Sequence, residues 1–106
     1  MKFIAFFEYN NEDVPVAVKT LMQLRASREK EPEKYAKLIS ENYSLGGELP
    51  NFTRDLRGFV LYEADNIDQL ANISALYHLN IPSTRVKFIP IVEGSKSVEL
   101  FMKAKK

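Results

Sequence analysis

The sequence predicts an α+β fold, in which helices pack on a sheet of antiparallel strands, and two segments carry most of this prediction. Residues 57–64 alternate as a strand does, with Phe59 and Leu61 on one side and Val60 and Tyr62 on the other. Residues 2–9 show the same pattern, with apolar side chains on both sides. Because both strands carry apolar side chains on both sides, they are expected to be covered on both faces. Each segment also runs into a helical pattern.

The first helix is expected after a turn at residues 10–13, with Pro15 in its first turn, where the missing N–H costs nothing. Pro32 should break or kink this helix near Glu31, and a second short helix should follow. The first helix is expected to bury an apolar stripe of Val14, Ala17, Val18, Leu21, Met22 and Leu24, and the second to bury Tyr35, Leu38 and Ile39.

The second half of the chain predicts two more strands and two more helices. Residues 42–48 indicate a weak strand interrupted by Gly46 and Gly47, and residues 49–55 indicate a loop. A helix should open at Asp65 and end at about Leu79. A last strand should follow over residues 85–92, and because it contains Pro90 it should lie at an edge of the sheet or carry a bulge. The buried stripe of the former helix is expected to be Ile67, Leu70, Ala71, Ser74 and Tyr77, and that of a closing helix Val98, Phe101 and Met102.

The resulting order is β-α-β-β-α-β with an added C-terminal helix, which is the ferredoxin-like sandwich pattern. Right-handed crossovers place the two main helices on one face of the sheet, so the other face is left bare although its strands are apolar. Either the terminal helix or a second sheet should cover that face.

Composition bounds the function. With 106 residues the chain is expected to form a single domain, residues 1–106. A net charge of +1 gives no electrostatic reason to expect nucleic acid or membrane partners. The absence of cysteine and the single histidine argue against a metal site, and no cofactor is expected. The first apolar run, Phe3 to Phe7, is too short for a signal peptide, so a cytoplasmic protein is expected.

Three parts of the chain carry a family resemblance. They are Met1-Lys2-Phe3 with its apolar strand, the run from Gly58 to Asp65 with the helix after it, and the strand from Val86 to Val92 with its helix. The chain resembles a small prokaryotic domain-of-unknown-function family of the dimeric α/β-barrel superfamily. This resemblance implies a dimeric α/β barrel and a homodimer formed through the sheet faces, and it supplies no substrate.

Four residues are the candidate ligand-binding side chains: Tyr62, His78, Glu8 and Asn10. Tyr62 lies on the central strand and His78 on the following helix, so the crossover should bring both into one cleft between sheet and helices. A phenol and a neutral imidazole could orient a small apolar or aromatic molecule there. The ordinary alternatives are a solvated carboxylate for Glu8 and an imidazole bonded to its own helix end for His78.

Other functions stay open at this stage, including whether the protein is an enzyme. One alternative is a haem-dependent or cofactor-free monooxygenase or isomerase. Haem-degrading members of the superfamily use an Asn, an aromatic residue and a His, and by this analogy Asn10, Tyr62 and His78 could take those three roles. The aromatic residue there is usually Trp, which this chain lacks.

Single-stranded RNA binding is a further alternative, because Arg57-Gly58-Phe59 matches the start of an RNA-recognition motif. Val60 and Leu61 then depart from that motif. A third class is an interaction subunit whose sheet face is an assembly surface.

Overall fold

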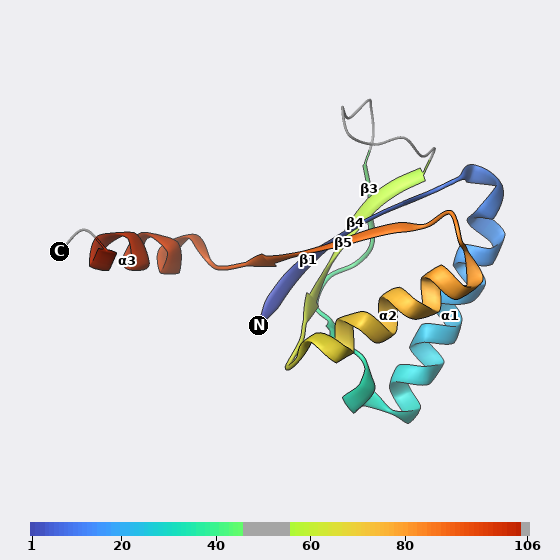
Figure 1. Ribbon diagram of the computed structural model, residues 1–106, viewed down its shortest axis with the longest axis horizontal. Coiled ribbons are helices and arrows are strands. Elements are labelled where there is room, and N and C mark those ends of the chain that lie inside the picture. Colours follow the sequence, from blue (N-terminus) through green and yellow to red (C-terminus); the bar gives the residue numbers. More distant parts are fainter. Residues whose placement is uncertain (46–55, 105–106) are drawn as a thin grey trace.

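The computed structural model describes residues 1–45 and 56–104, and this part is an antiparallel sheet with helices on one side (Figure 1). The fold is therefore α+β, as predicted. The elements in chain order are β1 (Lys2–Tyr9), η1 (Asn11–Asp13), α1 (Val14–Lys30), η2 (Pro32–Lys34), β2 (Lys37–Leu38), β3 (Tyr43–Ser44), β4 (Leu56–Glu63), α2 (Ile67–Asn80), β5 (Arg85–Ile91) and α3 (Gly94–Ala104). The predicted glycine interruption at Gly46 and Gly47 and the loop at residues 49–55 lie outside the described residues.

The sheet has β1 and β4 at its centre. Its order is β2-β4-β1-β5, and β3 also pairs with β4. Phe3 pairs with Tyr62 across β1 and β4, and all strand pairs are antiparallel. Among the described strands, β5 pairs only with β1, with Pro90 opposite Phe3. Of the two alternatives that Pro90 left open, an edge position or a bulge, the described strands therefore show the edge position.

Side-chain alternation divides the sheet into two apolar faces. One face packs on Leu24 of α1 and on Leu70 and Ile73 of α2. Its side chains are Phe3, Ala5, Phe7, Tyr9, Val60, Tyr62, Val86 and Phe88. The opposite face, here called the open sheet face, has an apolar centre of Ile4, Phe6, Phe59, Leu61 and Ile89. Both main helices lie on the first face (Figure 1), so the open sheet face is not covered by them.

The first helix begins and ends where proline predicts, but it buries a different stripe. Pro15 lies in its first turn and Pro32 follows its last residue. Val18 is 51% exposed and Met22 65% exposed, so their predicted burial is wrong. Thr20, a polar residue outside the predicted stripe, is fully buried instead.

Thr20 is buried because its hydroxyl is satisfied on both sides. Its Oγ1 donates to the Val16 carbonyl oxygen at 2.9 Å and accepts from Nδ2 of Asn80 at 3.0 Å. A hydroxyl with both partners present can be buried at little cost. This pair links α1 to the end of α2 and sets the rotation of α1.

The predicted second short helix after Pro32 is wrong. Only the 3₁₀ turn η2 forms, and strand β2 follows it. Side chains of α2 occupy the carbonyl groups that would have continued a helix, since Gln69 Nε2 donates to the Glu33 oxygen at 3.0 Å and Asn72 Nδ2 to the Lys34 oxygen at 2.8 Å. Tyr35 and Leu38 are half-buried, whereas Ile39 is 40% exposed.

The second main helix is capped by Asn66 rather than by Asp65. Asn66 Oδ1 accepts from the Gln69 backbone N–H at 3.1 Å, the usual role of an N-cap. The buried positions are Gln69, Leu70 and Ile73. The predicted stripe is therefore wrong at Ile67, which is 75% exposed, and at Ala71, which is also exposed.

The terminal helix α3 forms, but its predicted burial is wrong for the single chain. None of its residues is buried, and Figure 1 shows it standing apart at the far end of β5. A second surface would be needed to bury its apolar stripe.

Gly58 is the glycine with the least room for a side chain. A Cβ atom there would lie against the Tyr43 carbonyl oxygen and 2.8 Å from Cζ of Phe7. We therefore expect Gly58→Ala to lower the free energy of unfolding by about 1–3 kcal/mol, the usual cost of overpacking, measured by urea denaturation. Gly94→Ala is the matched control, because nothing lies within 4 Å of its Cβ position. Equal stability of the two variants would contradict this packing.

Candidate site: a cavity between the sheet and the helices

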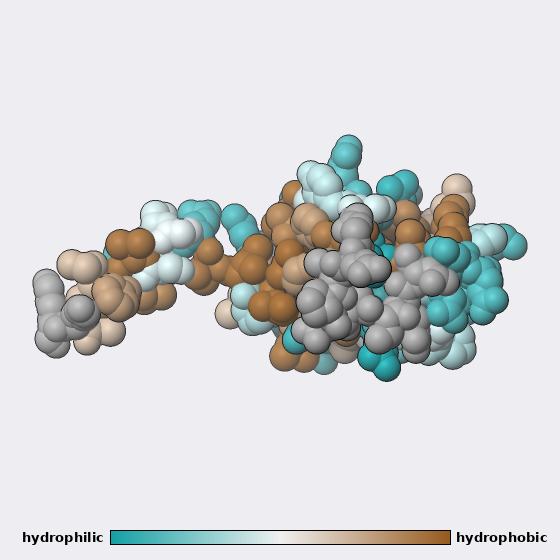
Figure 2. All heavy atoms as spheres, turned by 90° about the horizontal axis from the view of Figure 1, so that it is seen from above, coloured by the Kyte–Doolittle hydropathy of each residue, from teal (hydrophilic) through white to brown (hydrophobic). Residues whose placement is uncertain are grey.

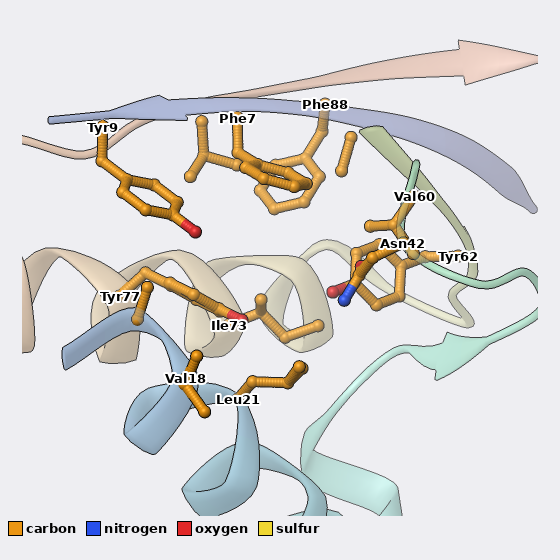
Figure 3. Close-up of a pocket in the computed structure, with 13 residues that line it drawn as sticks. Phe7, Tyr9, Val18, Leu21, Asn42, Val60, Tyr62, Ile73, Tyr77 and Phe88 are labelled. Carbon is orange, nitrogen blue, oxygen red and sulfur yellow. The ribbon is translucent and has the colours of Figure 1, made fainter. Parts of the chain in front are cut away.

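A cavity of about 100 Å³ lies between the helix-covered face of the sheet and the two main helices (Figure 3). Its sheet side is formed by β1, β4 and β5, and its helix side by α1 and α2. The lining residues are Ala5, Phe7, Tyr9, Ala17, Val18, Leu21, Asn42, Val60, Tyr62, Ile73, Tyr77, Val86 and Phe88. The predicted cleft between sheet and helices is therefore present.

Small side chains leave this space open. Ala5 on β1 and Ala17 on α1 both line the cavity and are almost fully buried, so no larger group fills the gap between their elements. The cavity reaches the surface where two of its lining residues are exposed, Val18 on α1 and Asn42 in the segment between β2 and β3. A small molecule could enter there.

Three tyrosines and one amide supply the polar groups of the lining. Tyr62 comes from β4, Tyr77 from α2 and Tyr9 from β1, and Asn42 lies at the mouth. Figure 3 shows the Tyr9 hydroxyl pointing from the sheet toward the helices. Each phenol can donate one hydrogen bond and accept others, so the cavity can orient a ligand that carries a polar atom.

Burial keeps these phenols neutral. Desolvation raises the pKa of Tyr9 above its ordinary value of 10.0. It also raises the pKa of Tyr77, with smaller contributions from Tyr62 and Tyr9. For Tyr62, burial raises the pKa, and the nearby positive charge of Arg28 opposes this rise. None of the three can therefore act as a base near neutral pH.

Arg28 lies behind Tyr62, at the edge of the site. Its Nε donates to the Ala36 carbonyl oxygen at 3.0 Å. Its Nη2 is buried and has no hydrogen-bond partner within the described part of the chain. A guanidinium has only hydrogen-bond donors, so the lone pairs of the Tyr62 oxygen are favoured on the side that faces Arg28. The phenolic proton of Tyr62 is then left to donate to another acceptor.

Of the four predicted site residues, only Tyr62 lines the cavity. His78 is exposed, and its Nδ1 donates to the Ser74 carbonyl oxygen at 2.8 Å on its own helix. Asn10 lies at the end of β1, where its carbonyl oxygen accepts from the Asp13 N–H at 3.0 Å. The expectation that Tyr62 and His78 face one cleft is therefore not met.

Glu8 lies on the open sheet face, away from the cavity. It is 5% exposed, and its Oε1 lies 3.9 Å from Nε of Arg85. Its Oε2 is buried with no hydrogen-bond partner among the described residues. Its neighbours across the sheet are Arg57 and Arg85, so its position is that of a carboxylate between two cations.

The haem-type arrangement of Asn10, Tyr62 and His78 is not assembled, since only one of the three reaches the cavity. Within residues 1–45 and 56–104, no group of three or more metal-binding side chains comes together. Phe59, the residue on which the RNA alternative depends, lies on the open sheet face and stacks on Tyr43 at 5.0 Å between ring centroids.

Sequence reasoning missed most of the site. Tyr9 could be assigned only as a core aromatic, and Asn42 and Arg28 carry no pattern of their own. Tyr77 had a usable signal, because it lies four positions after Ile73 and therefore on the same side of α2.

Comparison with protein-family models, with curated proteins and with solved structures gives no match for this chain. No helix in the described part of the chain has the length and apolarity that a membrane span requires. A functional assignment therefore depends on the geometry of the site.

The buried phenols predict a stability that depends on pH. In the unfolded chain tyrosine ionises near its ordinary pKa of 10.0, whereas the raised pKa of Tyr77 keeps it protonated when folded. The contribution of Tyr77 to the free energy of unfolding should therefore be fully present below pH 10 and should be lost as the pH rises above 10. In Tyr77→Phe the decline above this pH should be shallower, measured by urea denaturation between about pH 8 and pH 11. Tyr43→Phe, at an exposed tyrosine, is the control, and identical slopes for wild type and Tyr77→Phe would contradict the prediction.

Proposed function

We propose that this protein binds a small aromatic molecule in the cavity between its sheet and helices. One observation carries the proposal: an apolar cavity is already formed, contains three neutral tyrosine side chains, and opens beside Val18 and Asn42. Apolar pockets with a few convergent polar groups are typical ligand sites.

The size of the cavity restricts the ligand. Its volume of about 100 Å³ is below that of pockets for drug-sized ligands, which are about 300–1,000 Å³. An engineered cavity of about 150 Å³ in another protein holds benzene. The ligand is therefore a single ring or a group of similar size.

The polar groups restrict its chemistry. The oxygen of Tyr62 faces Arg28, so the phenolic proton is free to donate to a ligand. Tyr62 therefore favours a ligand with a hydrogen-bond acceptor, such as a carbonyl or phenolic oxygen. Tyr77 and Tyr9 add two more neutral hydroxyls. The lining that the structure describes contains no acidic or basic side chain, which supports binding rather than acid–base catalysis.

Closing the mouth should abolish binding. We expect Val18→Trp to eliminate detectable binding of benzene, phenol and benzaldehyde, because an indole at this half-exposed lining position would occupy the entrance. Met22→Trp is the matched control, since Met22 is exposed on the same helix but does not line the cavity. Binding is measured by NMR chemical-shift titration. Equal binding by the two tryptophan variants would overturn the proposal.

The same titrations in Tyr62→Phe test the assigned chemistry. Loss of the hydroxyl should weaken the affinity for phenol and benzaldehyde by about 2- to 10-fold, the equivalent of one neutral hydrogen bond, and should leave the affinity for benzene unchanged. Tyr43→Phe, outside the cavity, should bind all three as wild type does. A Tyr62→Phe effect as large on benzene as on phenol would indicate a packing role only.

We further propose that the chain is a ferredoxin-like member of the dimeric α/β-barrel superfamily and forms a homodimer through the open sheet face. The strand order β2-β4-β1-β5 with both helices on one face supports this assignment. Phe6 and Phe59 lie at the centre of the face, with ring centroids 6.1 Å apart. An apolar sheet face of this kind is typical of an interaction surface.

Charged residues frame the apolar centre at both ends. Glu8 lies between Arg57 and Arg85 across the strands at one end, and Glu63 lies between Lys37 and Lys2 at the other. Lys87 lies on the edge strand β5, opposite Phe6. An apolar centre with a polar rim is the usual composition of a protein interface.

A charge at the centre of this face should disrupt the dimer. Wild type should scatter light as a dimer at micromolar concentration, whereas Phe6→Asp should be monomeric or unfolded because a carboxylate cannot be buried without a partner. Val16→Asp, at an exposed apolar position on α1, is the control and should remain dimeric. A wild-type monomer of 12.2 kDa at all concentrations would refute the dimer and leave the cavity proposal untouched.

A further inference from the structure

The C-terminal arm, residues 92–104, extends away from the rest of the chain. Figure 1 shows α3 beyond the end of β5, and Figure 2 shows apolar residues continuing from the body onto the arm. Val92 is 59% exposed, Val98 62% and Met102 57%. The molecule measures 53 × 38 × 19 Å along its principal axes, an elongated outline for 106 residues.

An arm helix of this kind requires a surface to pack on. Helix α3 has 11 residues, below the roughly 12–15 residues at which isolated helices become even marginally stable in water. Val98, Phe101 and Met102 form one apolar stripe, at spacings of three and four residues. Lys96, Glu99 and Lys103 lie on the other side of the helix, which is the pattern of a helix that packs on one side.

Two contacts lie at the start of the arm. Lys2 Nζ lies 3.4 Å from Oε1 of Glu93, and the Glu93 carbonyl oxygen accepts from the Ser97 N–H at 3.1 Å. Only Val92 and Glu93 separate β5 from α3, and two residues span at most about 7 Å. The helix therefore starts close to the end of the edge strand, and Figure 1 shows it continuing in the direction of β5.

We infer that α3 of each copy packs on the open sheet face of a second copy, so that the dimer is held together by exchanged arms. This inference rests on the homodimer proposed above and names the segment that completes it. In the described part of the chain, α1 and α2 leave two apolar surfaces without a helix over them, Val98 and Met102 on α3 and the open sheet face, and a two-fold dimer covers both reciprocally.

Area supports a second copy as the occupant. Three long strands about 4.8 Å apart, with seven or eight residues each at about 3.3 Å, present a projected face of roughly 350 Å². A standard stable interface buries about 800 Å² per partner, so the sheet face alone falls short. The arm, which carries apolar residues and follows Ile89 and Ile91 of that face, supplies additional area.

The first test compares the two sides of α3. The double variant Val98→Asp/Met102→Asp should weaken the dimer about 100-fold or more, because each copy loses two buried apolar side chains, measured by sedimentation equilibrium. Leu100→Asp is the matched control, since Leu100 is similarly exposed but lies on the opposite side of the same helix, and it should change the dissociation constant less than about 3-fold. Equal effects of the two would overturn the inference.

The second test locates the arm. The chain has no cysteine, so Leu100→Cys can carry a single nitroxide label without further changes. Mixed with ¹⁵N-labelled wild type, this spin-labelled chain should broaden amide signals of the open sheet face, such as those of Phe59 and Leu61, in the other copy.

The outcomes separate the arm from the dimer. If wild type is dimeric but no intermolecular broadening occurs and Val98→Asp/Met102→Asp remains as tight a dimer, the exchanged arm is refuted and the sheet-face dimer stands. If wild type is monomeric and broadening appears only within a chain that is both spin-labelled and ¹⁵N-labelled, α3 folds back on its own sheet, and both proposals fail.

Discussion

The structure depends on one constraint, the strict alternation of apolar side chains on both faces of β1 and β4. Because side chains of a strand point to opposite faces in turn, two adjacent strands with this composition create two apolar surfaces and no polar one. Helices α1 and α2 cover the first surface, where Ala5 and Val60 meet Leu70 and Ile73. The second surface carries charged residues at its two ends and Lys87 on β5 opposite Phe6, and neither α1 nor α2 covers its apolar centre.

The helix-covered side is not filled completely, and this has an energetic consequence. A ring-sized ligand that binds the folded chain in this cavity of about 100 Å³ would stabilise it by mass action, which links binding in the cavity to stability. Ala5 and Ala17 leave the space open, because a larger apolar residue at either position would close it. Tyr62 places a hydroxyl in this space.

Polar side chains decided the details that hydrophobic periodicity could not. Thr20 is buried because Asn80 from another element satisfies its hydroxyl, and this displaces Met22 toward solvent. Gln69 is buried because it binds the backbone at Glu33, and this holds η2 as a single turn. Such partners are distant in the sequence, so a pattern of apolar residues cannot reveal them.

The sequence by itself determined the strands, their two apolar faces, the helix limits set by Pro15 and Pro32, and an edge position or a bulge for β5, because these follow from alternation and from proline chemistry within a few residues. Of the site it determined only Tyr62. The tertiary structure decided which stripe of each helix is buried, that Tyr9, Tyr77 and Arg28 gather around Tyr62 while His78 remains outside, and that α3 stands apart. Each of these depends on the rotation and placement of whole elements, which are fixed by contacts between residues far apart in the chain.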